Sequence, residues 1–240
     1  MPLTSFKLFA LVATEITHLL SITPPIPPPG PDDEVYTGQA FERGKILPIL
    51  RHMSGGMLTT SLACEFVLIV AAAYPATFPL PPALTDAICP RSPNPAALQS
   101  TPFAFLFGFF LIMAGCSLRV WCYRVLGRLF TYEVTFRPAH TLVTRAPYNL
   151  VRHPSYTGLY LHFIGVAVLH FAQGSWNREC GIMNTRGGIW VWVWLVLSTF
   201  TFVSVAKRAT VEDRMMKEKF GDAWEKYRRD VPCMFFPGII

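Results

Sequence analysis

The chain has 240 residues, of which 52% are hydrophobic and only 15% are charged. Soluble domains usually carry about 25% charged residues, so this composition excludes an ordinary soluble domain and favours an integral membrane protein. The formal net charge is +6, and the basic residues stand beside apolar segments. This placement indicates membrane topology and contact with anionic lipid. Nothing in the sequence is typical of a nucleic-acid-binding module.

Apolar segments of roughly the length needed to cross a bilayer recur along the chain. The second of them contains Glu65, an ionisable residue at membrane depth and therefore a functional candidate, unless it simply finds water or a polar partner. Pro75 is expected to kink or end that segment, because proline lacks the amide donor. The predicted spans are residues 3–22, 57–80, 103–118 with a continuation to 124, 157–173 and 189–206.

Proline-rich segments separate the early spans. Residues 23–31 cannot be helical for that reason, and residues 79–102 are expected to form a second, external loop. The polar residues 32–54 are expected to connect the first two spans. Gly108 and Gly115, inside the third span, are expected to allow close approach of another helix.

The last two apolar runs are joined by a short glycine-rich loop and are expected to form a helical hairpin. A hairpin returns the chain to the side from which it came, so the basic segments 119–152 and 207–229 can both face the cytosol. Residues 207–229 suit an amphipathic helix that lies on or leaves the membrane. The predicted fold class is an all-α integral membrane protein with about five transmembrane helices, a C-terminal helical hairpin and a cytosolic amphipathic helix.

The six cysteines form no CxxC pair, so neither a zinc site nor a disulfide-exchange site is expected. Several of them lie inside apolar runs, where cysteine acts as a small hydrophobic residue. A disulfide framework is not expected. The cysteines are Cys64, Cys89, Cys116, Cys122, Cys180 and Cys233.

The most informative stretch is 140–158, which reads HTLVTRAPYNLVRHPSYTG. Its polar and charged side chains directly precede an apolar run, which predicts a site at the water–lipid boundary. The alternative is a basic loop that only sets topology. His153 is either a proton shuttle or a polar contact. Pro154 suits a first helical turn, and the unpaired amides of such a turn can bind a carboxylate or a phosphate.

Arg208 and Glu212 are four residues apart and share one helix face. A cation and a carboxylate there could hold a zwitterion, or an anionic substrate beside a cationic cofactor. The alternative is a surface ion pair worth about 0.3–0.5 kcal/mol. GxGxxG, P-loop and GxSxG motifs are absent, which makes a soluble Rossmann-type methyltransferase or dehydrogenase improbable.

Taken together, these motifs resemble the isoprenylcysteine carboxyl methyltransferase family over roughly residues 105–240. The resemblance implies a multi-pass enzyme of the endoplasmic reticulum membrane. Such an enzyme uses S-adenosylmethionine to methylate the C-terminal carboxylate of a prenylated cysteine in CaaX-processed proteins. Its partners would be prenylated protein or peptide C-termini and the bilayer. The likeness is carried by HTLVT at 140–144, Pro147-Tyr148, VRHPSYTG at 151–158, Arg208, Glu212-Asp213, Phe220-Gly221, Trp224, Tyr227 and Pro237.

The resemblance also implies roles for single residues. Arg208 and Glu212 would be catalytic, with Arg208 receiving the substrate carboxylate and Glu212 holding the amino end of the cofactor. No metal ligand is implied. Residues 1–102 would hold N-terminal spans and proline-rich loops, and 103–240 the catalytic membrane domain. The implied cofactor-binding residues are His140, Thr141, Leu142, Val143, Tyr148, His153, Pro154, Ser155, Tyr156 and Glu212.

The chain departs from the family pattern at two positions. Ala146 stands where the family usually has glycine, and Asp213 replaces a second glutamate. The HPSY step and the run that begins at Glu212 are also similar to membrane sterol reductases, which use NADPH but usually have Asn in place of Ser155. A methyltransferase with another lipid or terpenoid acceptor is a further alternative. An inactive scaffold would be expected to lack Arg208 or Glu212.

Overall fold

The computed structural model describes residues 2–23, 34–35, 46–91, 94–131, 135–136 and 140–239. Within these residues, five helical stretches are long and apolar enough to cross a membrane, and two two-residue strands pair antiparallel. The predicted all-α membrane class is therefore confirmed. The prediction for residues 24–31 lies outside the described residues. The long helices are α1 (Pro2–Ile22), α2 (Ile46–Ala73), α5 (Phe103–Leu126), α6 (Pro154–Phe171) and α8 (Gly188–Phe220), and the strands are β1 (Glu34–Val35) and β2 (Thr135–Phe136).

The chain forms two compact units. Unit 1 comprises Met1–Leu19, Arg51–Ala114 and Leu161–Ser198, and unit 2 comprises Leu20–Leu50, Gly115–Tyr160 and Thr199–Ile240. The long helices contribute residues to both. The expected division at residue 102 concerns which part carries the chemistry, and it stays a prediction.

Helix α2 begins at Ile46 rather than at residue 57, so the prediction of a loop over 32–54 is wrong for residues 46–54. One polar residue of this segment has a tertiary partner that suits a helix. Ser54 is buried, and its Oγ accepts a hydrogen bond from the Trp194 indole at 3.1 Å. The helix ends at Ala73, which confirms the prediction that Pro75 would end it.

The expected loop at 79–102 contains two short helices, α3 (Pro82–Ile88) and α4 (Pro95–Gln99). Each begins with a proline, at the position where a helix makes no use of the missing N–H. Asn94 caps α4 by accepting from the Ala97 amide at 3.3 Å. Three further short elements lie in the remaining connections: the 3-10 turns η1 (Gly127–Leu129) and η2 (Ile182–Asn184), and α7 (Trp176–Glu179).

Glycines bring α5 and α6 together, as predicted. In unit 1, a side chain on Gly108 would lie 2.9 Å from the carbonyl oxygen of Gly165. In unit 2, a side chain on Gly158 would lie 2.6 Å from the carbonyl oxygen of Gly115. Any larger residue at these positions would push the two backbones apart.

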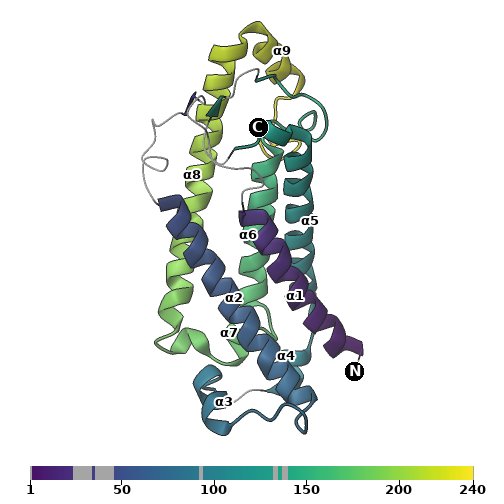
Figure 1. The fold of residues 1–240 in the computed structure, drawn as a ribbon, viewed down its shortest axis with the longest axis vertical. Coiled ribbons are helices and arrows are strands. Elements are labelled where there is room, and N and C mark those ends of the chain that lie inside the picture. Colours follow the sequence, from purple (N-terminus) through teal and green to yellow (C-terminus); the bar gives the residue numbers. More distant parts are fainter. Residues whose placement is uncertain are drawn as a thin grey trace. The chain divides into compact units, whose positions relative to one another are not determined.

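Helix α8 has 33 residues and is about 50 Å long at 1.5 Å per residue, well beyond a hydrocarbon core of about 30 Å. It passes residue 207 without a break and ends at Phe220, after which α9 (Asp222–Asp230) follows (Figure 1). Gly221, at φ 51°, makes the turn between them. The predicted amphipathic helix 207–229 is therefore the end of α8 plus α9, because only Gly221 interrupts the helix.

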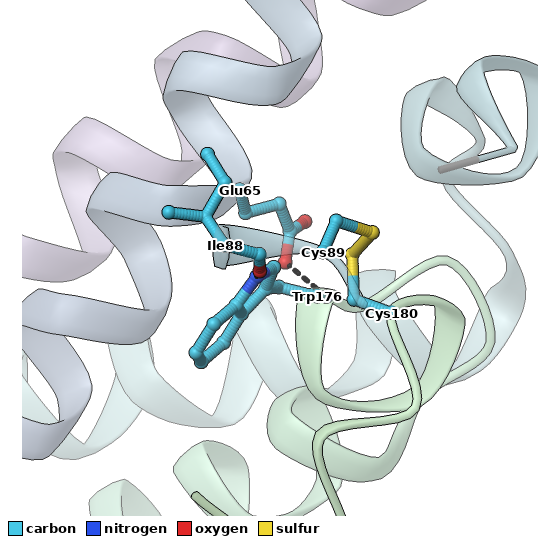
Figure 2. Close-up of a disulfide and its surroundings, with 5 residues drawn as sticks. All are labelled: Glu65, Ile88, Cys89, Trp176 and Cys180. Carbon is cyan, nitrogen blue, oxygen red and sulfur yellow. Dashed lines mark hydrogen bonds between the residues drawn. A yellow bond between two sulfur atoms is a disulfide. The ribbon is translucent and has the colours of Figure 1, made fainter. Parts of the chain in front are cut away.

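The expectation that the cysteines form no disulfide is wrong. Cys89 and Cys180 are joined across a sequence separation of 91 residues, and Figure 2 shows the bond beside Trp176. Their spacing carries no signal, because only the tertiary fold brings the connection after α2 to the connection after α6. Disulfides persist in oxidising compartments, so these connections are expected to face one. The remaining described cysteines, Cys64, Cys116, Cys122 and Cys233, are free thiols.

Glu65 has a polar partner inside unit 1. The Lys7 ammonium lies 2.9 Å from its Oε1, and both side chains are almost wholly buried. Lys7 Nζ also donates to the carbonyl oxygens of Leu98 and Gly174. The second carboxylate oxygen accepts from the Trp176 amide at 2.8 Å, as drawn in Figure 2. The structural alternative for Glu65 therefore fits better than a direct role in chemistry.

Candidate active site

Glu212 is the centre of a cluster of polar side chains in unit 2. Arg208 Nε donates to its Oε1 at 2.9 Å, one turn earlier on α8. The Tyr156 hydroxyl, from α6, donates to the same oxygen. His153 Nδ1 lies 3.5 Å from Oε2. The fold thus brings together Arg208, Glu212, His153 and Tyr156, while the Glu212 side chain keeps 23% of its surface exposed and can be reached by a ligand.

Asp213 contacts His153 at the ring nitrogen that does not face Glu212. His153 Nε2 lies 2.8 Å from Asp213 Oδ1, and Arg152 Nε donates to Asp213 Oδ2 at 3.1 Å. Burial alone would lower the pKa of His153, but hydrogen bonds to Asp213 and Glu212, and their charges, outweigh burial and raise this pKa to about 9. The ring is therefore an imidazolium at neutral pH. Neither Arg152 nor Asp213 was expected as a site residue; their signal was adjacency to His153 and Glu212.

The C-terminal tail holds the His153 segment in place. The amides of Arg152 and His153 donate to the carbonyl oxygens of Cys233 and Met234 at 3.0 and 2.8 Å. Arg152 Nη1 also donates to the carbonyl oxygens of Val231 and Pro232. No sequence motif indicates this role, because backbone carbonyls carry no residue-specific pattern.

Pro154 and Ser155 position the segment. Pro154 is the first residue of α6, as the sequence predicted. The oxygens of Ser155, both carbonyl and hydroxyl, accept from Arg119 Nη1 at 3.1 and 3.3 Å. The same guanidinium donates to the Ser21 carbonyl oxygen. Ser155 therefore points to a buried arginine, and no described contact joins it to Glu212.

Tyr148 is buried beside the Cys122 thiol, and its carbonyl oxygen accepts from the Tyr227 hydroxyl at 2.7 Å. Burial, and then Cys122 and the charge of Glu212, raise the pKa of Tyr148 well above its usual value, so its phenol stays neutral. The peptide between Ala146 and Pro147, which opens this turn, is cis.

The stretch 140–143 lies outside the helices and strands and is partly exposed. Leu142 packs against the cluster of Trp224, Tyr227 and Val231, and the His140 ring lies 6.1 Å from that of Phe220. Burial, and then the charge of Lys219, lower the pKa of His140, which favours its neutral form. In the part of the chain that the structure describes, no hydrogen bond engages the backbone of residues 141–143. That backbone is available to a ligand.

The charges of the cluster nearly cancel. With His153 protonated, three positive groups (Arg152, His153 and Arg208) face two negative groups (Glu212 and Asp213), so 3 − 2 leaves +1. A residual positive charge suits an anionic substrate, while the partly exposed Glu212 side chain suits a cationic group. Among the described residues, no three His, Cys, Asp or Glu side chains gather as a metal site would require.

The fold and this cluster define a multi-pass, all-α membrane protein with a charged site at the end of apolar helices. Residues 106–177 match the model of the isoprenylcysteine carboxyl methyltransferase (ICMT) family. The matched residues include the 140–156 stretch, whereas Arg208 and Glu212 lie beyond them. The resemblance found in the sequence is confirmed over the matched region.

Two curated relatives come from Arabidopsis thaliana. Protein-S-isoprenylcysteine O-methyltransferases A and B are 35% and 37% identical to this chain over 65 residues, which are 26% of this chain and 33% of each relative. The chain thus spans about one third of the length of the curated relatives it matches. These matches support the enzyme class expected from the sequence, a prenylcysteine carboxyl methyltransferase.

Proposed function

We propose that this protein transfers a methyl group from S-adenosylmethionine to the C-terminal carboxylate of a prenylated cysteine, as CaaX-processed proteins carry it. The family match over residues 106–177 and the names of the two relatives support this reaction class. One observation carries the assignment of the site. Arg208, His153 and Tyr156 hold the carboxylate of Glu212, whose side chain stays partly exposed.

The described residues fit this cofactor. Its amino-acid end carries an ammonium group, and the exposed edge of Glu212 offers a carboxylate for it. The unengaged backbone of residues 141–143 offers amides and carbonyls to the remaining polar groups. The cofactor is assigned to Glu212 and to His140, Thr141, Leu142, Val143, Tyr148, His153, Pro154, Ser155 and Tyr156. When bound, it supplies an electrophilic methyl group, whose carbon–sulfur bond breaks as the new ester bond to oxygen forms.

Arg208 is assigned to the substrate carboxylate. A C-terminal carboxylate has a pKa near 3.5, so it is already ionised at neutral pH and needs no general base. His153 would be a poor base in any case, because its pKa of about 9 keeps it protonated. Its role is to orient Glu212 one helical turn from Arg208. The two side chains then place the donor and the acceptor next to each other.

The membrane location suits a prenylated substrate. Each methylene buried from water contributes about 0.8 kcal/mol, so the prenyl group keeps the chain end in the bilayer, where a multi-pass enzyme can meet it. The endoplasmic reticulum membrane is the proposed location. The Cys89–Cys180 disulfide supports it, because the lumen of this compartment is oxidising.

A methyl-transfer assay on the purified chain in detergent tests the proposal. Labelled S-adenosylmethionine and a farnesylcysteine analogue should yield a labelled ester, while the analogue with its carboxylate blocked should yield none. Binding of labelled NADPH in place of S-adenosylmethionine would contradict the proposal and favour the sterol-reductase alternative. Transfer to a terpenoid acid, but not to the farnesylcysteine analogue, would favour the alternative acceptor.

A further inference from the structure

Unit 1 contains a cavity of about 230 Å³ at the end of α6. We propose that this cavity binds a phosphoryl group that carries a neighbouring hydrogen-bond donor, such as the headgroup of an anionic phospholipid. The proposal is independent of methyl transfer. The residues that carry it are Arg91, Arg178, Asn177, Phe171 and Met183, all of which line the cavity.

Two guanidinium groups line this cavity without a protein acceptor. Arg91 and Arg178 are both exposed, and within the described residues neither side chain makes a hydrogen bond or an ion pair. The one carboxylate next to Arg178 in sequence, Glu179, accepts from the Gly174 amide at 2.9 Å. Two unpaired guanidiniums in one concave site favour an oxyanion, since the planar fork of arginine matches phosphate geometry.

The fold brings together the two segments that carry these arginines. The Cys89–Cys180 disulfide joins their segments, with Arg91 two residues after one cysteine and Arg178 two residues before the other. Gly181 is in the left-handed region at φ 65°, and a side chain there would meet Arg91 Cδ at 3.2 Å. The Arg91 side chain therefore occupies space that a larger residue at position 181 would fill. The frame is anchored in turn, because the Trp176 indole donates to the Ile88 carbonyl oxygen at 2.7 Å (Figure 2).

A buried amide supplies the second half of the recognition. Asn177 lines the same cavity and is only 2% exposed. Its Nδ2 lies 2.9 Å from His170 Nδ1, whereas its Oδ1 is buried with no partner in the described part of the chain. A buried acceptor without a donor is costly. Because Oδ1 is itself covered, a ligand hydroxyl or ammonium group beside the phosphate would stabilise it once a lining side chain shifts.

The apolar wall indicates a lipid rather than a soluble phosphate. Helix α6 has 18 residues and is about 27 Å long, so its last residue, Phe171, lies where the hydrocarbon core of about 30 Å gives way to headgroups. Phe171 is 38% exposed, and Met183 lies on the same cavity. The volume is below the roughly 300–1,000 Å³ of drug-sized sites, which suits a headgroup alone.

Thermal unfolding of the full chain in neutral detergent tests this site, because a ligand that binds the native state raises the midpoint. Short-chain phosphatidylglycerol, which is anionic and carries hydroxyls, should raise it; short-chain phosphatidylcholine, which lacks the donor, should not. Glycerol 3-phosphate is the soluble probe. If it raises the midpoint as much as the lipid does, the source is a free phosphate; if only the lipid does, the source is the headgroup.

Variants locate the effect. Arg91→Ala and Arg178→Ala should each need at least about tenfold more phosphatidylglycerol for the same shift, while Arg186→Ala, an exposed arginine of the same connection outside the cavity, should behave as wild type. Should the ligand-free midpoint of an alanine variant drop, Arg91→Lys and Arg178→Lys replace it and should show a smaller loss. The proposal is overturned if the variant with both Arg91→Ala and Arg178→Ala shows the same midpoint shift as wild type. It is also overturned if neither phosphatidylglycerol nor glycerol 3-phosphate shifts the midpoint of wild type.

Discussion

Each unit contains a cluster of charged side chains, and the two clusters differ in how far protein groups enclose them. In unit 1, Lys7 and Glu65 are 0% and 3% exposed, and the ammonium of Lys7 contacts the Glu65 carboxylate and two backbone carbonyl oxygens. In unit 2, Glu212 is 23% exposed, although three side chains hold it. A charge enclosed by protein groups serves the fold, whereas a charge held firmly with one edge open can serve a ligand.

The energies of the two clusters differ for the same reason. Removing one partner of an enclosed pair leaves a buried charge without compensation, which is strongly destabilising. Removing a cation of the open cluster leaves carboxylates that water can still reach, since the Glu212 and Asp213 side chains are 23% and 17% exposed. Substitutions in the Lys7–Glu65 pair should therefore mainly lower the stability of the protein, and substitutions in the Glu212 cluster should mainly lower its activity.

The largest effect is expected from Glu65→Ala. It leaves the Lys7 ammonium buried and unpaired, and should lower the free energy of unfolding by about 3–5 kcal/mol, measured as the unfolding midpoint in detergent. Asp86→Ala, at an exposed carboxylate of the same unit, is the control and should change little. The double variant Lys7→Met/Glu65→Leu removes both charges and should recover much of the loss. No recovery would show that the hydrogen bonds, and not the charge pair, stabilise unit 1.

Next in size are Arg208→Ala and Glu212→Ala. Each should lower methyl transfer by about 10²–10³-fold or more, because each removes a group that positions a reactant. Arg208→Ala should largely spare binding of S-adenosylmethionine, whereas Glu212→Ala should lose both, as isothermal calorimetry would measure. The exposed neighbours Lys207→Ala and Glu218→Ala are matched controls. Unchanged turnover in either site variant would remove that residue from the site.

The disulfide is expected to matter less, and only for unit 1. Cys89→Ser/Cys180→Ser should lower the free energy of unfolding by about 2–4 kcal/mol, because the crosslink restricts the unfolded chain. The methyl-transfer rate of the folded protein should be preserved, since the Glu212 cluster belongs to the other unit. A large loss of turnover at a temperature where the variant is folded would contradict this separation.

The last effect is a pH dependence of stability from His153. Its folded pKa of about 9 lies above its ordinary 6.5, so its contribution is complete below pH 6.5 and is lost as the pH rises through 9. The complete contribution corresponds to about 3 kcal/mol at about 1.4 kcal/mol per pKa unit, and only part of it is lost at any pH below 9. The unfolding midpoint of wild type should therefore fall between pH 6.5 and 9.5 more than that of His153→Gln. Equal falls would show that other groups titrate.

Part of the site was visible in the sequence. The spacing of Arg208 and Glu212 predicted a shared helix face, and α8 provides it. Pro154 predicted the start of α6, where it lies. The clustering of His153 and Tyr156 ahead of an apolar run predicted a polar site, and both residues contact Glu212. Local periodicity and proline chemistry are properties of short segments, so they can be read without the fold. The roles of these residues stay predictions.

Other features depended on segments that meet only in the folded chain. Asp213 was read as a departure from a family pattern, but it pairs with both His153 and Arg152. The Cys89–Cys180 bond and the partner of Glu65 join positions 91 and 58 residues apart in sequence (180 − 89 and 65 − 7). No local pattern encodes such pairings.

The amino-acid sequence is sufficient to identify a helical membrane protein, because length and apolarity decide whether a segment can remain in a bilayer. It also identifies the residues that can bear charge next to the apolar spans. Which of those charges are enclosed and which stay open follows from the folded chain, because burial depends on neighbours contributed by distant segments.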